Sequence, residues 1–232
     1  MKTNPYQLRS LRAVSRRALP LIILTGWLSL GPLAAQADPR GGAVLAQQGG
    51  SGIPACVACH GARGEGQTAA GFPRLAGQPQ AYLLKQLQDF STGTRKNAQM
   101  EPIARALSAQ QKRDAADYYA SLPGWKADAN TPVASPQSLA GSKLALQGNW
   151  NKDIPACFAC HGRDGAGIPP HFPALSGQPG AYVRAQLKAW QAGKRSNDPQ
   201  GLMKAVADRM TDAEIDAVSL YLERPSFSGK EK

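Results

Sequence analysis

The stretch Ile53-Pro54-Ala55-Cys56-Val57-Ala58-Cys59-His60-Gly61 returns 101 positions later as Ile154-Pro155-Ala156-Cys157-Phe158-Ala159-Cys160-His161-Gly162, with one residue changed. Each copy contains Cys-x-x-Cys-His, the pattern that attaches a haem covalently. Two thiols one helical turn apart can bond to the two vinyl groups of one porphyrin, and the adjacent histidine then lies beneath the iron. The repeat therefore predicts two covalently bound haem c groups. The predicted attachment residues are Cys56, Cys59, Cys157 and Cys160, and the predicted proximal iron ligands are His60 and His161.

All four cysteines of the chain belong to these two motifs. In an exported protein, four cysteines would ordinarily suggest two disulfides. The two-residue gap, the histidine after each pair and the duplication all oppose that interpretation. A zinc ribbon needs cysteine pairs about 15–20 residues apart, whereas these pairs lie 101 residues apart. A thioredoxin-like pair would need a βαβ context, and no segment here has the pattern of a strand.

The first 37 residues have the order of a secretory signal peptide. Five basic residues and no acidic one precede a mostly apolar run at 18–33, and Ala35-Gln36-Ala37 then offers a cleavage site. An uncleaved membrane anchor is the weaker alternative, because the run is shorter than the roughly 20 residues that a spanning helix needs. Export predicts a periplasmic protein of 195 residues, which is enough for two domains of about 100 residues each.

The strongly basic composition comes partly from this leader. The whole chain has a net charge of +11, but residues 38–232 carry 22 basic and 16 acidic side chains, a net charge of +6. Four haem propionates would lower the charge further. We therefore do not interpret the high pI as nucleic-acid binding. It leaves a mildly basic surface that could meet an acidic redox partner.

Similarity between the two halves extends beyond the haem motif. Phe72-Pro73-Arg74-Leu75-Ala76-Gly77-Gln78-Pro79 matches Phe172-Pro173-Ala174-Leu175-Ser176-Gly177-Gln178-Pro179, and further single residues recur at an offset of 100. Residues 126–137 are small, polar and rich in proline, which is typical of a linker. We predict a signal peptide at 1–37, a first domain at 38–129 and a second domain at 130–232.

Each half is predicted to be all-α, in the order helix, loop, helix, loop, helix. The first helix is expected at 43–48 and 139–147. The second starts near Pro79 or Pro179 and ends at Gly93 or Gly193. The last helix of each half begins with a capping box, formed by Ser108 and Gln111 in the first half and by Thr211 and Glu214 in the second. These helices are expected to end at Pro123 and Pro225. A domain of this size has a marginal core, so we expect the haem-free chain to be poorly folded.

The function depends on the ligand on the far side of each iron. Methionine there stabilises Fe(II) and blocks access, which makes an electron carrier, whereas a vacant position can bind peroxide or a gas. Met100 lies 40 residues after His60 and Met203 lies 42 after His161, each in the irregular stretch before the last helix. An isolated methionine usually fills a core, but matched positions in both halves predict axial ligation.

Two unmatched residues are given structural roles. Met210 corresponds to Leu107 in the first half and precedes the Thr211 cap, so we expect it to pack on Ile215. His171 has no counterpart, because Gly71 stands at its position. We interpret it as a partly exposed loop residue, the alternative being a second histidine ligand.

Residues around the ligands have predicted supporting roles. A metal-bound histidine usually donates its other N–H to an acceptor, and the backbone carbonyls of Pro73 and Pro173 are the candidates. Arg95 and Arg195 precede the two methionines closely, as do Asn97 and Asn197. Because arginine suits carboxylate pairing, we predict that these arginines hold haem propionates. The alternative is an ordinary exposed loop arginine.

These features together resemble the dihaem cytochrome c4 family, over roughly residues 40–225. They are the tandem Cys-x-x-Cys-His-Gly motifs, the Phe-Pro-x-Leu-(Ala/Ser)-Gly-Gln segments, the Gly-x-Arg-x-Asn stretches and the trailing methionines. The resemblance implies two tandem class I cytochrome c domains related by a pseudo-twofold axis, each a small helical fold wrapped around one covalent haem. It also implies that His60 with Met100, and His161 with Met203, bind the two irons. Two insertions depart from the repeat, Asp198-Pro199-Gln200 and the segment 149–153.

The resemblance implies a periplasmic carrier of single electrons between respiratory partners. The expected donor is a membrane respiratory complex and the expected acceptor a terminal oxidase, with peripheral membrane association left open and no nucleic acid involved. No nucleophile motif, spare Cys/His cluster or cofactor loop indicates an enzyme. The alternatives are a haem subunit of a larger dehydrogenase complex, and a dihaem peroxidase or thiosulfate dehydrogenase with an open iron site.

Overall fold

The computed structural model describes residues 38–124 and 135–223, which belong to one compact unit, Ala35–Lys232. The predicted signal peptide, most of the predicted linker and Pro225 lie outside the described residues. Within them every regular element is a helix, and extended backbone occurs only as isolated bridges. None of these helices is long and apolar enough to cross a membrane.

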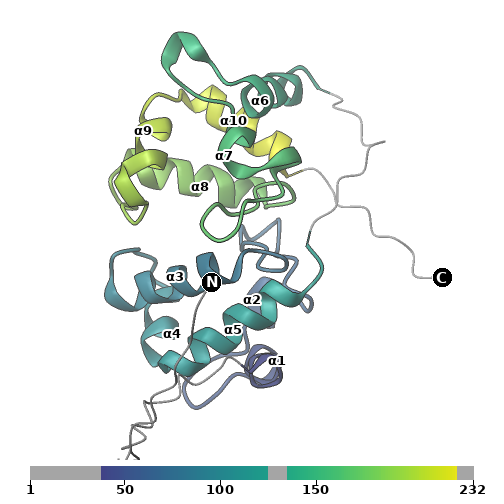
Figure 1. The fold of residues 1–232 in the computed structure, drawn as a ribbon, viewed down its shortest axis with the longest axis vertical. Coiled ribbons are helices and arrows are strands. Elements are labelled where there is room, and N and C mark those ends of the chain that lie inside the picture. Colours follow the sequence, from purple (N-terminus) through teal and green to yellow (C-terminus); the bar gives the residue numbers. More distant parts are fainter. Residues whose placement is uncertain (1–37, 125–134, 224–232) are drawn as a thin grey trace, which may run out of the picture. The chain divides into compact units, whose positions relative to one another are not determined.

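Within residues 38–124 and 135–223, each half contains five α-helices rather than the three that the sequence predicts (Figure 1). In the first half they are α1 (Pro39–Gln48), α2 (Val57–His60), α3 (Gln80–Thr92), α4 (Met100–Ala106) and α5 (Ala109–Ser121). In the second half they are α6 (Pro136–Gln147), α7 (Cys157–His161), α8 (Gly180–Gln191), α9 (Leu202–Asp208) and α10 (Asp212–Leu222). The described part of the second half also contains three short 3-10 turns: η1 (Trp150–Lys152), η2 (Arg163–Gly165) and η3 (Pro199–Gly201).

Most helix ends follow the predicted signals. Both capping boxes form, at the starts of α5 and α10. Gly93 ends α3 in the left-handed conformation, whereas α8 stops at Gln191, two residues before Gly193. The first helix of each half starts earlier than predicted, because Asp38 and Ser135 cap it and a proline occupies its first position. Pro136 and Gln137 therefore belong to α6 and not to the linker.

The two methionines lie in short helices, which corrects the prediction of an irregular stretch. Met100 is the first residue of α4 and Met203 the second residue of α9. Each helix begins on a polar side chain: the Met100 N–H donates to Asn97 Oδ1 at 2.9 Å, and the Met203 N–H to Asp198 Oδ2 at 2.7 Å. The inserted Asp198 thus takes the place that Asn97 has in the first half, and the insertion leaves Met203 at a helix start.

The first and last helices of each half pack against one another, α1 on α5 and α6 on α10. Glycines permit the close approach. A Cβ at Gly42 would lie 2.7 Å from the carbonyl carbon of Asp114, and one at Gly141 would lie 2.6 Å from that of Ala217. The spacing between the helices therefore depends on the absence of a side chain at these two positions.

The apolar cores of the two halves differ in extent. Buried residues of the second half form one continuous cluster that includes Ile154, Trp190, Ile215 and Leu222. The first half has two smaller clusters, one around Leu45 and the other around Tyr119. Cys56 packs against the second of these and Cys157 against the core of the second half.

Candidate haem centres

Both predicted iron-binding histidines are buried at the ends of short helices. His60 ends α2 and is 7% exposed, and His161 ends α7 and is 6% exposed. The predicted acceptors are confirmed, since His60 Nδ1 lies 2.9 Å from the carbonyl oxygen of Pro73 and His161 Nδ1 lies 2.8 Å from that of Pro173. A carbonyl only accepts, so Nδ1 carries a proton, and in the neutral ring Nε2 keeps its lone pair. Burial lowers the pKa of both histidines, and the hydrogen bond to the proline carbonyl raises it. The effect of burial is the larger one, so the pKa of each histidine lies below its ordinary value.

The cysteines of each motif differ in exposure in the same way in both halves. Cys56 and Cys157 are half-buried, while Cys59 and Cys160 are exposed. Burial raises the pKa of the Cys56 thiol, and that of Cys157 to about 11. None of the four cysteines forms a disulfide. Each pair lies within one turn at the start of a short helix, the spacing that two thioether bonds to one porphyrin need.

Met210 and His171 have the environments that their predicted structural roles imply. Met210 is 6% exposed and belongs to the same core cluster as Ile215, as predicted. His171 is exposed, as predicted. Met100 and Met203 are half-buried, and Met203 packs against the core of its own half. In each half, the candidate histidine and methionine thus lie on separate short helices.

Arg95 and Arg195 are not exposed loop residues, because each is only 6% exposed. Each guanidinium stacks on an aromatic ring of its own half, Arg95 on Phe90 at 4.5 Å and Arg195 on Trp190 at 4.0 Å. The two residues also form an antiparallel backbone bridge between the halves.

Their hydrogen bonds go to glutamine, tyrosine and asparagine oxygens of both halves. Arg95 donates to Gln86, Gln186 and Tyr182 over 2.7–3.0 Å. Arg195 donates to Gln186, Gln86, Tyr82 and Asn197 over 2.8–3.4 Å. Among the described residues no carboxylate accepts a hydrogen bond from either guanidinium, so two buried positive charges remain without an anionic partner in direct contact.

Asn97 and Asn197 stand at equivalent positions of the repeat but have different exposure and different hydrogen-bond partners. Asn97 is exposed and accepts from the Met100 N–H at the start of α4, whereas Asn197 is 7% exposed and donates to Gln86 and Asp89 of the first half. Asn197 is free for this contact because Asp198, and not Asn197, accepts from the Met203 N–H at the start of α9.

Gln78 and Gln178 bind the opposite half, and the sequence analysis assigned them no role. Gln178 accepts from the Arg74 N–H at 3.0 Å and donates to the Arg74 carbonyl at 2.9 Å. Gln78 makes the same two bonds to Ala174, both at 2.9 Å. A glutamine recurs at this position in both halves, although the local structure needs no polar residue there. This recurrence is the sequence signal that could have predicted a contact between the halves.

Arg74 adds a contact that the second half lacks. Its guanidinium donates to the carbonyl oxygens of Ala76 and, at 2.9 Å, of Ser176 in the other half. Burial lowers the pKa of Arg74 to about 10. The matching residue of the second half is Ala174, which has no guanidinium, so it cannot make the equivalent contact.

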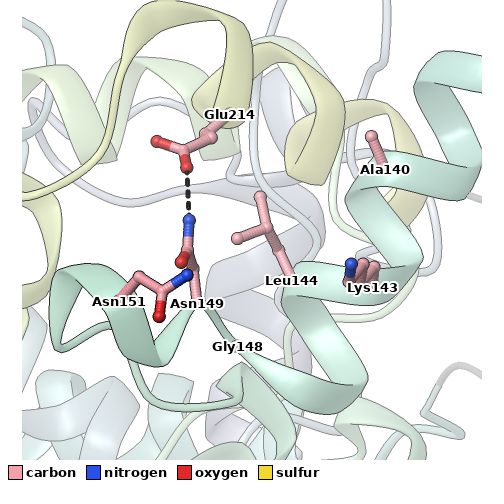
Figure 2. A pocket seen from close by; sticks show the side chains of 7 residues that line it. All are labelled: Ala140, Lys143, Leu144, Gly148, Asn149, Asn151 and Glu214. Carbon is pink, nitrogen blue, oxygen red and sulfur yellow. Dashed lines mark hydrogen bonds between the residues drawn. The ribbon is translucent and has the colours of Figure 1, made fainter.

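The inserted segment 149–153 is hydrogen-bonded to α10 of its own half. Asn149 and Lys152 donate hydrogen bonds to Glu214 of α10, at 3.1 and 2.7 Å. Trp150, between them in the sequence, is 72% exposed. Beside the insertion lies a pocket of about 390 Å³ lined by α6, Asn149, Asn151 and Glu214 (Figure 2). Figure 2 shows Lys143 and Glu214 as its only charged side chains. This pocket has no cluster of metal-ligating side chains.

Comparison with known proteins identifies the repeated unit. A family described as "Cytochrome c" matches residues 42–123 and again 139–224. The chain belongs to the cytochrome c family. A cytochrome c4 of Thiocapsa roseopersicina is 40% identical over 190 residues, covering 80% of this chain and 92% of the relative, which places this cytochrome in the dihaem c4-like group.

Two other similar proteins have names that refer to thiosulfate dehydrogenase. A "Thiosulfate dehydrogenase electron acceptor" of Thiomonas intermedia (strain K12) is 49% identical over 173 residues, which cover 75% of this cytochrome and 79% of the relative. A solved structure of "Thiosulfate dehydrogenase (TsdBA)" from Marichromatium purpuratum is 38% identical with a TM-score of 0.74. That match covers 84% of this cytochrome but only 42% of the longer chain.

This cytochrome therefore carries two covalent haem c groups, and the residues present fit them. Each half offers a Cys-x-x-Cys pair on one helical turn, and a buried neutral imidazole whose Nε2 is left for iron. Haem supplies a one-electron Fe(III)/Fe(II) couple, and the cytochrome is an electron carrier.

Proposed function

We propose that this cytochrome accepts electrons from a thiosulfate dehydrogenase and passes them, one at a time, toward a terminal oxidase. The observation that carries the proposal is the 49% identity to a protein named as the electron acceptor of that enzyme. The similarity to part of the longer TsdBA chain supports the same donor. The donor is thus more specific than the membrane respiratory complex that the family resemblance implies.

The ligand set that we propose suits a carrier and not an enzyme. Cys56, Cys59, Cys157 and Cys160 hold the two haems. His60 with Met100, and His161 with Met203, bind the irons. An iron closed by methionine binds no substrate and changes little in geometry on reduction, which favours electron transfer. Arg95 and Arg195 are proposed to face the propionates, since both are buried and neither donates to a described carboxylate.

The site of action that we propose is the periplasm. Residues 1–37 have the order of a cleavable signal peptide, and covalent haem attachment through Cys-x-x-Cys-His accompanies export. N-terminal sequencing of the protein isolated from a periplasmic extract should begin at Asp38. A chain that keeps its leader and sediments with membranes would contradict cleavage.

The donor can be tested with purified components. Oxidised cytochrome is mixed with catalytic amounts of thiosulfate dehydrogenase and with thiosulfate, and reduction is followed through the haem absorbance. We expect both haems to become reduced when enzyme and thiosulfate are both present. No reduction by the enzyme would refute the donor, and rapid reduction by thiosulfate without the enzyme would show that the chain is itself a dehydrogenase.

A further inference from the structure

One peptide group connects each proximal histidine to the opposite half of the molecule. The carbonyl of Pro73 accepts from His60 Nδ1 at 2.9 Å. The N–H of the same peptide group belongs to Arg74, and it donates to Gln178 Oε1 at 3.0 Å. The chain of bonds therefore runs from the histidine of the first half, through a single amide, to a glutamine of the second half.

The second half repeats the arrangement in the reverse direction. The carbonyl of Pro173 accepts from His161 Nδ1 at 2.8 Å, and the N–H of Ala174 donates to Gln78 Oε1 at 2.9 Å. Each histidine is thus connected to the glutamine of the other half and not to its own.

Both glutamines are held in one orientation. Gln78 and Gln178 are 2% and 5% exposed. Each also donates its Nε2 to the carbonyl of the residue whose N–H it accepts, Ala174 or Arg74, at 2.9 Å. Exchanging the amide oxygen and nitrogen would place donor against donor and acceptor against acceptor, so only the observed orientation satisfies all four groups.

Hydrogen bonds in series strengthen one another. When a peptide N–H donates to an acceptor, its carbonyl becomes more negative and accepts more strongly, by about 10–30% per bond. A stronger acceptor for Nδ1–H makes the imidazole a more basic iron ligand. A more electron-donating imidazole favours Fe(III) and lowers the reduction potential of that haem.

We propose that Gln178 is a positioning residue for the haem bound through His60, and Gln78 for the haem bound through His161. Each half thereby sets the ligand strength of the other half's iron. This inference rests on the proposed ligand assignment. It concerns the tuning of the two haems and not the identity of the electron donor.

The test compares Gln178→Met and Gln78→Met, which keep the side-chain length and remove both bonds. In ¹H–¹⁵N spectra of the reduced holoprotein, Gln178→Met should move the His60 Nδ1–H resonance upfield and leave His161 in place. Gln78→Met should do the opposite. In a redox titration the affected haem should become easier to reduce by about two- to fivefold, or about 20–40 mV at 59 mV per tenfold for one electron.

Gln186 provides a matched control, because it also binds across the halves but, among the described residues, makes no hydrogen bond to either proline peptide. It accepts from Arg95 and Arg195, at 2.7 and 2.8 Å. If Gln186→Met produces the same shifts as Gln178→Met, the effect comes from loosening between the halves and the proposal is wrong. It is also wrong if Gln178→Met moves both histidine signals equally, moves only His161, or moves neither.

A second variant keeps the test decisive if Gln178→Met fails to retain haem. Gln178→Glu keeps an acceptor for the Arg74 N–H, and its charge makes that acceptor stronger. We expect the His60 Nδ1–H resonance to move downfield, opposite to the methionine variant, and an unchanged resonance in protein with two intact haems overturns the inference. Protein with a missing or five-coordinate haem in the wild type would instead contradict the ligand assignment itself.

Discussion

Replacing Gly42 by alanine should force α1 and α5 apart in the first half. The new Cβ would lie 2.7 Å from the carbonyl carbon of Asp114 and 2.8 Å from Cβ of Tyr118, with the Asp114 carbonyl oxygen closer still. Ordinary van der Waals contact begins near 3.4 Å. Two of these neighbours are backbone atoms of α5, so no rotation of a side chain can relieve the clash.

The expected cost follows from two opposing effects. Overpacking of a close contact costs about 1–3 kcal/mol, while replacing glycine by alanine inside a helix returns about 0.5–1 kcal/mol. The net loss is up to about 2.5 kcal/mol, and each kcal/mol lowers the midpoint of unfolding of a domain of this size by about 4–8 °C. Leu45 and Ala46 lie buried on the same helix, so separating the helices also opens both small cores of the first half.

Gly41→Ala is the matched control, since it lies next to Gly42 on the same helix. Its Cβ would meet only the ends of acidic side chains, Asp38 Oδ2 at 3.1 Å and Asp114 Oδ2 at 3.7 Å. We expect it to be neutral or stabilising. Thermal unfolding of both purified holoproteins, followed by far-ultraviolet circular dichroism, measures the difference. A Gly42→Ala protein as stable as Gly41→Ala would refute the reasoning that the glycine sets the helix spacing.

Three other predictions follow from the site and its surroundings. Met100→Ala and Met203→Ala should each remove about half of the methionine–iron charge-transfer absorbance and let one reduced haem bind carbon monoxide, so an unchanged spectrum in either variant would show that its methionine is not a ligand. Burial raises the pKa of Glu214, but hydrogen bonds from Lys152, Thr211 and Asn149 outweigh burial and lower this pKa to about 2. The ionised carboxylate therefore stabilises the folded form at pH values above 4.5, the ordinary pKa of glutamate, and this stabilisation is lost as the pH falls toward 2. Urea unfolding from pH 7 to pH 2 should accordingly decline less steeply in Glu214→Gln, and identical slopes would contradict this. Haem-free chain, made by replacing all four cysteines with alanine, should melt broadly because the cores of the first half are small; a sharp cooperative transition would oppose the view that the porphyrin completes the core.

Local sequence signals predicted the helix ends because their physical causes are local. A serine or threonine followed three residues later by glutamine or glutamate satisfies the free N–H groups at a helix start, and both boxes form as predicted. The methionine helices were missed for a related reason. α4 and α9 are seven residues each, too short for a periodic apolar pattern, and the side chains that accept from their first turns, Asn97 and Asp198, are of different types.

The repeat allowed one non-local contact to be predicted. Pro73 and Pro173 stand at nearly equal distances after the two histidines, and a metal-bound imidazole needs an acceptor for its second N–H. The carbonyls accept as expected. A prediction of this kind is possible because the contact joins residues only 12 or 13 positions apart within one half.

By itself the sequence determined the number of haems and the all-helical character of both halves, and it predicted the attachment residues, since each of these depends on residue types at short, fixed spacing. Only the tertiary structure decided which residues join the halves. Gln178 meets Arg74, and Arg95 meets Tyr182, across separations of 104 and 87 residues. Their pairing depends on how two finished domains pack together, and neither local periodicity nor propensity encodes which polar side chains are buried by that packing.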